Sequence, residues 1–306
     1  MIGRTACCVA AVALFAAAAD PARPGGATLA LRLSSGAARV FWRESHAPVR
    51  WTAADASLAA LVTWHPGQRG VEWSTVPIAG QGEAHALTLV LARIDPRSVS
   101  LDLVWGIERD RAAWTVDRAT DAALALNAGM FVEQLPWGWV VMNGRERLAP
   151  GHGPLSSAVV GLADGRVVWV DGDDVSTWLG RADVRFAFQS YPTLLVGDGA
   201  VPVALRDGAI NGTHRDARLA LGLDRQGRLL VAMTRLDVPI PGADRIPFGL
   251  TVPEMAAVMG ALGARHAVLL DGGLSAQVTI SDSTGQARAW KGLRRVPLAL
   301  VARAGP

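Results

Sequence analysis

Short apolar segments separated by hairpin-type turn pairs recur along this chain and largely decide its fold class. Segment 139–142 precedes Asn143-Gly144, and segment 158–162 precedes Asp164-Gly165. Asn-Gly and Asp-Gly pairs accept the positive φ angles that a two-residue hairpin turn requires. Further β-like segments lie at 28–33, 38–42, 86–93, 99–105, 122–126, 167–170, 193–196, 201–205, 219–223, 229–233, 267–270 and 296–302. Repeated hairpins of this kind predict strands that run mostly antiparallel.

One helix has sequence signals at both of its ends. Thr251 is a favoured N-cap, and Glu254 three residues later completes a capping box. The apolar residues that repeat at helical spacing are Met255, Val258, Met259 and Leu262. Gly263 favours a helix end, and a smaller helix is expected near 53–62. Since strands outnumber helices, the chain is predicted to be α+β, with a mixed, mostly antiparallel sheet and a few flanking helices.

Two of the apolar segments end in a polar side chain that could serve a site. One segment runs into Asp271 and two glycines, and the other runs into Asn127. An acid at the mouth of a buried strand suits catalysis, but Asp-Gly is also a common turn pair, so both roles stay open. We expect the two strand ends to lie side by side in one sheet, where their polar tips share a pocket.

The N-terminus has the pattern of a secretory signal peptide at residues 1–19. Arg4 precedes an apolar run at 7–18 that is shorter than the roughly 20 residues needed to cross a bilayer. Cleavage of this leader predicts a periplasmic or secreted protein with no membrane span, and an uncleaved anchor is the alternative. We expect residues 20–70 to form a linker and an N-terminal extension, and residues 71–303 to form one catalytic-type domain.

Composition excludes several classes of protein. Both cysteines, Cys7 and Cys8, lie in the leader, so the mature chain has no disulfide, thiol nucleophile or cysteine ligand. The formal net charge is +3 and basic residues are interspersed with acids, which argues against nucleic-acid binding. The acidic run at 171–174 lacks the alternating ligands of a calcium loop. The sequence thus predicts no metal site and no cofactor, although a divalent ion near Asp271 stays undecided.

Several motifs, taken in order, resemble the phosphodiester glycosidase family over roughly residues 71–303. The matching stretches are 70–73, 93–96, 127–131, 136–138, 187–192, 194–196, 218–222 and 270–275. They include Asn-Ala-Gly-Met-Phe from Asn127, Arg-Leu-Ala-Leu-Gly from Arg218, and Asp-Gly-Gly-Leu-Ser from Asp271. Two positions depart from the family pattern: Tyr191 and Leu274 stand where the family usually has glycine. Either change is expected to alter the substrate rather than abolish the chemistry.

The resemblance implies cleavage between a sugar anomeric carbon and a phosphodiester oxygen, on an envelope or extracellular glycan. The leaving group is a phosphate monoester, whose second pKa is about 6, so it departs as an anion with little help. One carboxylate and one cation for the phosphate therefore suffice, which points to Asp271 as nucleophile or base and to Arg218 as the phosphate ligand. Asn127 and Gln189 are expected to orient sugar hydroxyls.

A wider set of substrate-binding residues follows from the same resemblance and from proximity along the chain. It comprises Gly129, Glu133, Ser190, Trp137, His214, Gly272, Gly273 and Ser275. Glu133 is the expected second carboxylate because it lies near Asn127 in sequence. Trp137 either stacks on a sugar or is buried, and burial is the commoner fate of tryptophan.

A different class of function also fits the sequence. A non-catalytic polysaccharide-binding protein, acting in exopolysaccharide assembly or export, would keep Trp137 and Trp139 as sugar platforms without needing an ionised, aligned Asp271. Release of free sugar from a sugar-1-phosphodiester distinguishes this alternative from the enzyme.

Overall fold

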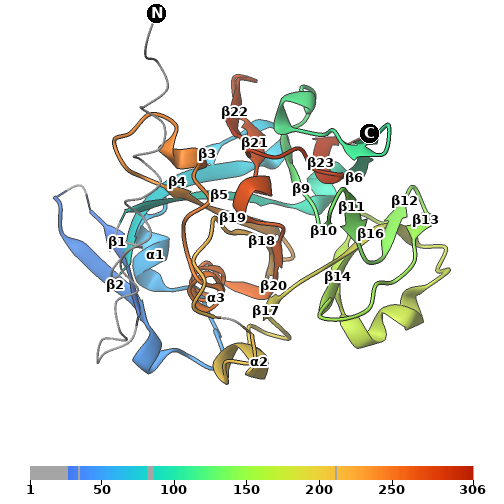
Figure 1. Ribbon diagram of the computed structural model, residues 1–306. Helices are drawn as coiled ribbons and strands as arrows, with labels where there is room; N and C mark the ends of the chain where they lie inside the picture. Colours follow the sequence, from blue (N-terminus) through green and yellow to red (C-terminus); the bar gives the residue numbers. More distant parts are fainter. Residues whose placement is uncertain (1–26, 34, 81–85, 211, 306) are drawn as a thin grey trace, which may run out of the picture.

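The computed structural model describes residues 27–33, 35–80, 86–210 and 212–305, which form three main β-sheets with few helices (Figure 1). The predicted signal peptide and the beginning of the predicted linker lie outside the described residues. Every strand pair among the described residues is antiparallel. The predicted α+β class with mostly antiparallel strands is confirmed.

Nine described strands form the largest sheet, here called the main sheet. In spatial order they are β17 (Thr193–Leu195), β20 (Ala264–Leu270), β18 (Leu219–Asp224), β19 (Leu229–Leu236), β5 (Leu87–Ile94), β4 (Glu72–Gly80), β1 (Thr28–Arg32) and β2 (Ala38–Arg43), and β3 (His65–Pro66) pairs with β4. The N-terminal segment thus supplies edge strands of this sheet, because β1 pairs directly with β4.

Two five-stranded sheets accompany the main sheet. The second sheet has the order β22 (Ala287–Trp290), β21 (Val278–Ser281), β9 (Leu124–Asn127), β23 (Leu298–Ala304) and β6 (Val99–Trp105). The side sheet has the order β13 (Arg145–Leu148), β12 (Val140–Met142), β16 (Val184–Ser190), β14 (Ser157–Leu162) and β15 (Val167–Asp171). Two separate hairpins are β7 (Ile107–Glu108) with β8 (Arg111–Ala112), and β10 (Met130–Val132) with β11 (Leu135–Trp137).

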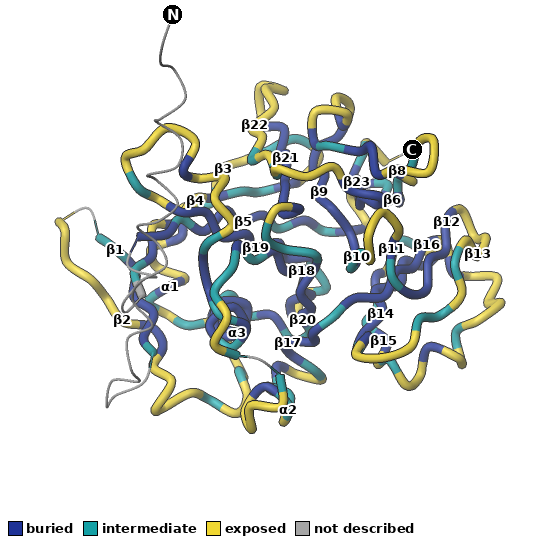
Figure 2. Tube along the Cα trace, viewed as in Figure 1, coloured by how far each residue is buried: buried dark blue, intermediate teal, exposed yellow. Residues whose placement is uncertain are grey.

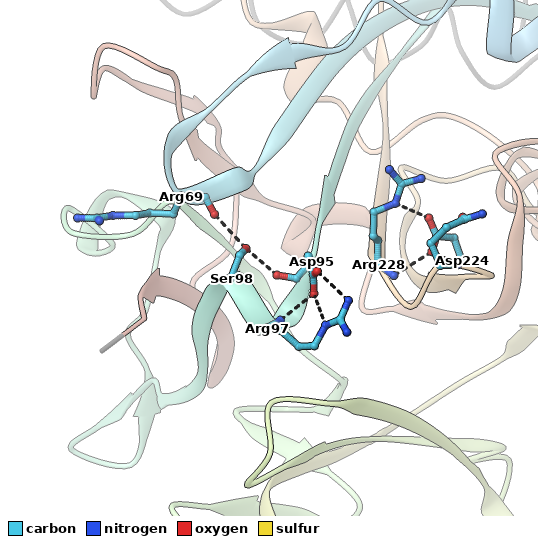
Figure 3. Close-up of polar contacts among 7 residues, drawn as sticks. Arg69, Asp95, Arg97, Ser98, Asp224 and Arg228 are labelled. Atoms are coloured by element: carbon cyan, nitrogen blue, oxygen red, sulfur yellow. Dashed lines mark hydrogen bonds and ion pairs between the residues drawn. The ribbon is translucent and has the colours of Figure 1, made fainter.

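Aspartates fix the turns that join neighbouring strands (Figure 3). The Asp224 carboxylate accepts hydrogen bonds from the backbone N–H groups of Gln226 and Arg228, at 2.9 and 2.8 Å. The Asp95 carboxylate likewise accepts from the backbone N–H of Arg97 at 3.0 Å. An aspartate that binds the backbone two residues on imitates a backbone turn, and in the Asp224 turn Gly227 supplies the positive φ of 81° that completes the reversal.

The central core is built by all three sheets. Its buried side chains include Val90 and Met233 from the main sheet, Leu126 and Leu300 from the second sheet, and Phe188 from the side sheet. In Figure 1 the side sheet lies at one flank of the other two. Strand β16 is buried along most of its length, but its sequence Val-Arg-Phe-Ala-Phe-Gln-Ser has only three consecutive apolar residues. The polar residues at both of its ends explain why the apolar pattern did not predict a strand here.

Helix α3 (Val252–Ala261) packs on the other face of the main sheet, and the predicted capping box of Thr251 and Glu254 is present. The helix is buried around its whole circumference, not on one face as expected. Small residues make this possible: a Cβ at Gly260 would lie 2.2 Å from the ring of Trp51. The other helices are α1 (Ala56–Leu61) and α2 (Val203–Arg206).

Two expectations about strands are wrong. Segment 201–205 does not form a strand but leads into α2, where Pro202 is the N-cap residue and no N–H is needed. The strand ends at Asn127 and Asp271 do not belong to one sheet, because β9 lies in the second sheet and β20 in the main sheet. Their ends nevertheless meet, since Nδ2 of Asn127 donates to the backbone carbonyl of Asp271 at 2.8 Å.

Candidate active site

The register between β18 and β20 places Arg218 and Asp271 at the same end of the main sheet. Leu219 pairs with Leu270 in this antiparallel pair. The residue before Leu219 and the residue after Leu270 therefore leave the sheet together, and both line one pocket. The predicted meeting of a guanidinium and an acid follows from strand register.

The two glycines after Asp271 let the segment before β18 approach closely. A Cβ at Gly272 would lie 2.4 Å from the carbonyl oxygen of Ala217, and the N–H of Gly273 donates to that oxygen at 2.7 Å. Gly273 has a φ of +55°, and a Cβ there would lie 3.0 Å from Oδ2 of Asp216. Glycine at both positions thus brings the Asp216 carboxylate against the loop that carries Asp271.

Asp216 and Asp271 are therefore two carboxyl groups in one pocket, and both are perturbed. Burial raises the pKa of Asp271, the charge of Asp216 raises it further, and a hydrogen bond from Ser275 and the charge of Arg294 partly oppose this rise. Burial also raises the pKa of Asp216, against the opposing charge of Arg218. Perturbed carboxyl pairs are typical of acid–base sites.

Arg218 is held by backbone carbonyls, not by an acid. Its Nε donates to the carbonyl of Leu250 at 2.9 Å, and its Nη2 donates to the carbonyl of His214 at 2.7 Å. Among the described residues, Nη1 has no hydrogen-bond partner, so it is the donor left for a ligand. Burial lowers the pKa of Arg218, and the charge of Asp216 opposes that effect.

A buried ion pair fixes the segment that carries His214, Asp216 and Arg218. Arg215 donates from Nη1 and Nη2 to the two carboxylate oxygens of Glu254, at 2.6 and 3.0 Å. Glu254 is 1% exposed at its side chain and also accepts from the N–H of Thr251. The capping box of α3 therefore positions the pocket wall as well as the helix.

The pocket has a volume of about 320 Å³. Its lining comprises Met130, Tyr191, Pro192, Ile210, His214, Asp216, Arg218, Val252, Leu269, Leu270, Asp271 and Gly272. Of the residues proposed from the sequence, Asp271, Arg218, His214 and Gly272 line it. Tyr191 belongs to the wall, consistent with the expectation that a side chain at this position narrows the pocket.

Three further predicted residues surround Asp271 without lining the pocket. Asn127 is fully buried; its Nδ2 donates to the carbonyl of Asp271, and its Oδ1 accepts from the N–H of Gln277 at 3.1 Å. Gly129 accepts from the N–H of Asp271 at 2.9 Å. Ser275 hydrogen-bonds the Asp271 carboxylate. The amide of Asn127 is thus committed to backbone groups and positions Asp271 in place of a sugar hydroxyl.

The remaining predicted residues lie away from the pocket lining. Gln189 is 3% exposed and its Oε1 accepts from the N–H groups of Trp139 and Gly151, at 2.7 and 2.9 Å. Ser190 is fully buried and its hydroxyl donates to the carbonyl of Leu269.

Glu133 and Trp137 belong to the hairpin β10–β11. Glu133 is exposed at the tip of the hairpin, so it is not the second carboxylate of this pocket. Trp137 pairs with Met130 and packs near Gly153, where a Cβ would lie 3.5 Å from its ring.

Asp216 is the residue that sequence reasoning missed. It stands two residues before Arg218, in an Arg-Asp-Ala-Arg stretch that ends at the start of β18. The sequence signal for Asp216 is an acid two positions before an arginine that immediately precedes a strand. Proximity to Asn127 along the chain favours Glu133 instead, but closeness in sequence does not make the two side chains close in space.

The fold and the pocket define an antiparallel β protein with a two-carboxylate site, and sequence comparison places it in a family. The sequence model described as phosphodiester glycosidase matches residues 120–303. That is more than half of the chain, so the protein belongs to the phosphodiester glycosidase family. The resemblance expected from the motifs is confirmed. No curated protein matches the sequence significantly.

Solved structures share the fold at low sequence identity. The catalytic domain of zebrafish N-acetylglucosamine-1-phosphodiester alpha-N-acetylglucosaminidase, auto-inhibited by its pro-peptide, aligns with a TM-score of 0.57 and 14% identity, over 80% of this chain and 88% of that one. A hypothetical protein from Synechocystis aligns with a TM-score of 0.52 and 16% identity, over 77% of this chain. This chain spans 62% of the Synechocystis protein.

Neither a metal-binding cluster nor a membrane-spanning helix is found among the described residues. In that part of the chain, no three His, Cys, Asp or Glu side chains are grouped to hold a metal ion. A helix of the length and apolarity needed to span a membrane is likewise not found there.

Proposed function

We propose that this protein is a hydrolase that cleaves the bond between a sugar anomeric carbon and a phosphodiester oxygen. The observation that carries the proposal is the convergence of Asp216, Asp271 and Arg218 on one pocket. Membership of the phosphodiester glycosidase family supports the reaction class. The proposed substrate is a sugar-1-phosphodiester on an envelope or extracellular glycan.

The two carboxyl groups divide the acid–base work of hydrolysis. Either carboxylate attacks the anomeric carbon, or it takes a proton from the attacking water, and the second group stabilises the positive charge that develops on the sugar. The C–O bond breaks with its electron pair going to the phosphate monoester. The water supplies the new anomeric hydroxyl, and its other proton reaches solvent through the carboxylate. Asp271 and Asp216 are suited to this because burial raises the pKa of each carboxyl group, which makes both more effective in proton transfer.

Arg218 binds the departing phosphate in this proposal. Its two backbone hydrogen bonds hold the guanidinium plane in place, and Nη1 remains to donate to a phosphate oxygen. Because the group is held before substrate binds, little rotamer freedom is lost when the phosphate arrives. Two backbone carbonyl groups therefore hold the Arg218 guanidinium in the position where it neutralises the leaving phosphate.

The proposed location is the periplasm or the outside of the cell, on the basis of the leader pattern at residues 1–19. Fractionation of cells that express the full chain tests this location. Recovery of the protein from the cytoplasm at full length would contradict it.

The reaction is tested by supplying sugar-1-phosphodiesters in water enriched in oxygen-18. Glycosidic cleavage places the label on the anomeric oxygen of the released sugar and leaves the phosphate monoester unlabelled. Label in the phosphate would show attack at phosphorus and overturn the proposal. Binding of polysaccharide without release of sugar would favour the non-catalytic alternative.

A further inference from the structure

A second concavity has three arginines among its seven lining residues. It has a volume of about 1110 Å³, and its lining comprises Glu108, Arg109, Arg111, Ala112, Ala113, Gln134 and Arg295. We call it the arginine cleft. None of its three arginines forms an ion pair with a described residue, whereas Glu108 pairs with Arg118. The cleft therefore presents a net positive charge to solvent.

The hairpin β10–β11 connects the arginine cleft to the active-site pocket. Met130 at the start of β10 lines the pocket, and Gln134 at the tip lines the cleft. Gln134 is also joined to the cleft wall, because its Oε1 accepts from the N–H of Ala112 at 2.9 Å. The tip itself is exposed (Figure 2).

A second connection runs through the segment that carries Arg294 and Arg295. Gln277 accepts from the N–H of Val116 at 3.0 Å and donates to the carbonyl of Arg294 at 3.1 Å. Its own N–H donates to Asn127, the residue that holds Asp271. The side chain of Arg294 hydrogen-bonds the carbonyl of Glu133. The buried residue Gln277 thus connects the segment of Arg294 and Arg295 to Asn127, whose side chain holds Asp271.

We propose that the arginine cleft binds a second phosphate group of the substrate, so that the enzyme acts on a glycan with repeated phosphodiesters. This inference rests on the proposed function of the active-site pocket. Arginine binds phosphate oxygens through paired donors, and the three cleft arginines form no ion pair with a described residue. Glu108 in the same cleft is near enough to Arg109 and Arg295 to feel their charges, but its own ion pair is with Arg118. The cleft and the pocket share no lining residue, so a phosphate in the cleft is not the one that Arg218 contacts.

Direct binding tests this inference without relying on turnover. The probe is a tetramer of N-acetylglucosamine 1-phosphate units joined by phosphodiesters, and its comparison is the monomeric methyl diester. Calorimetry is done in the Asp271→Asn background, so that no hydrolysis occurs. The triple change Arg109→Ser, Arg111→Ser and Arg295→Ser is expected to weaken tetramer binding about tenfold and monomer binding less than twofold. The salt dependence of tetramer binding should also fall.

A matched control removes the same charge elsewhere. Arg39→Ser, Arg145→Ser and Arg147→Ser change exposed arginines on β2 and β13 that form no ion pair with a described residue. This control should leave tetramer binding within twofold of the starting protein. Equal losses in the two triple variants would mean that net charge alone acts, and would overturn the proposal.

Two further ligands complete the test. A tetrasaccharide of uncharged sugars that carries a single phosphodiester should bind like the monomer, and tetramer-like affinity for it would overturn the role of the second phosphate. Vesicles that contain phosphatidylglycerol test a membrane surface as the partner. Loss of vesicle binding in the cleft variant, with tetramer binding intact, would also overturn the proposal. Failure of wild-type protein to release sugar would refute the hydrolase instead, and would leave the binding result standing.

Discussion

At the scale of single residues, Asp216 and Asp271 have the clearest consequences. Replacing either by asparagine keeps the size of the side chain and removes the group that transfers a proton or attacks the sugar. We expect Asp271→Asn and Asp216→Asn each to lower kcat by about 10²–10⁴-fold, measured as sugar released from a sugar-1-phosphodiester. Asp173→Asn, on an exposed aspartate, is the control. Full activity in either site variant would remove that residue from the mechanism.

The same carboxyl groups predict how stability depends on pH. Because burial raises the pKa of Asp271, the folded state holds the proton more tightly than the unfolded chain does. The free energy of unfolding therefore falls as pH rises between the ordinary aspartate pKa of about 4 and the raised value. The destabilising effect is absent below the ordinary aspartate pKa and complete above the raised one.

Asp271→Asn should therefore stabilise the fold at pH 7 while it abolishes activity. We expect a Tm gain of about 1–3 °C at pH 7 that shrinks toward zero near pH 4. Calorimetric scans at several pH values measure it. A gain of the same size at every pH would show that packing, not titration, is responsible.

The proposed role of Arg218 leads to a prediction about the substrate class. Arg218→Gln removes the charge that faces the leaving phosphate but retains a donor. The loss of kcat/KM should be at least about tenfold larger on a sugar-1-phosphodiester than on a neutral aryl glycoside of the same sugar. Equal losses on both substrates would contradict the phosphate assignment.

At the scale of strands and loops, the sequence predicted more of the fold than of the site. Strands such as β6 were predictable because turn residues bounded an apolar pattern, which in β6 alternates with polar residues. The capping box at Thr251 was readable because its partners are three residues apart. Asn127 shows what the sequence does not predict. Its position at the end of a strand was evident, but its hydrogen bond to the backbone of Asp271 exists only because two different sheets meet there. Asp216 was missed because its neighbour, Gly273, is distant in sequence.

Asn127 therefore tests how two elements are held together. Asn127→Ala leaves the carbonyl of Asp271 and the N–H of Gln277 without partners in a buried setting, which costs about 2–4 kcal/mol of unfolding free energy. We expect kcat to fall about tenfold with KM within twofold, because Asp271 is misplaced but the pocket wall is kept. Gln226→Ala, on an exposed turn amide, serves as the control. A large rise in KM would instead indicate that the Asn127 side chain contacts the substrate.

At the scale of the whole molecule, the pocket lies where the three sheets meet. Asp271 leaves the main sheet, Asn127 leaves the second sheet, and Tyr191 lies where the chain passes from the side sheet into β17. No single sheet builds the site, so the way the side sheet is attached should influence substrate binding. The attachment is polar as well as apolar, because hydroxyl groups link β17 to the beginning of β14.

Thr193 is the centre of that attachment and provides the last prediction. Its hydroxyl lies 2.7 Å from that of Ser156 and 2.6 Å from that of Ser157, and its N–H donates to Ser156 at 2.9 Å. Thr193→Val removes the hydroxyl with little change in shape, so the serines lose a buried partner at a cost of about 1–3 kcal/mol. Thr279→Val, on a buried threonine with no side-chain hydrogen bond to a described residue, is the control.

Because Tyr191 and Pro192 line the pocket just before Thr193, loosening this crossing should raise KM several-fold and change kcat less. Steady-state kinetics and chemical denaturation on the two threonine variants measure both effects. If Thr193→Val loses stability while KM stays the same, the side sheet supports the fold without shaping the site.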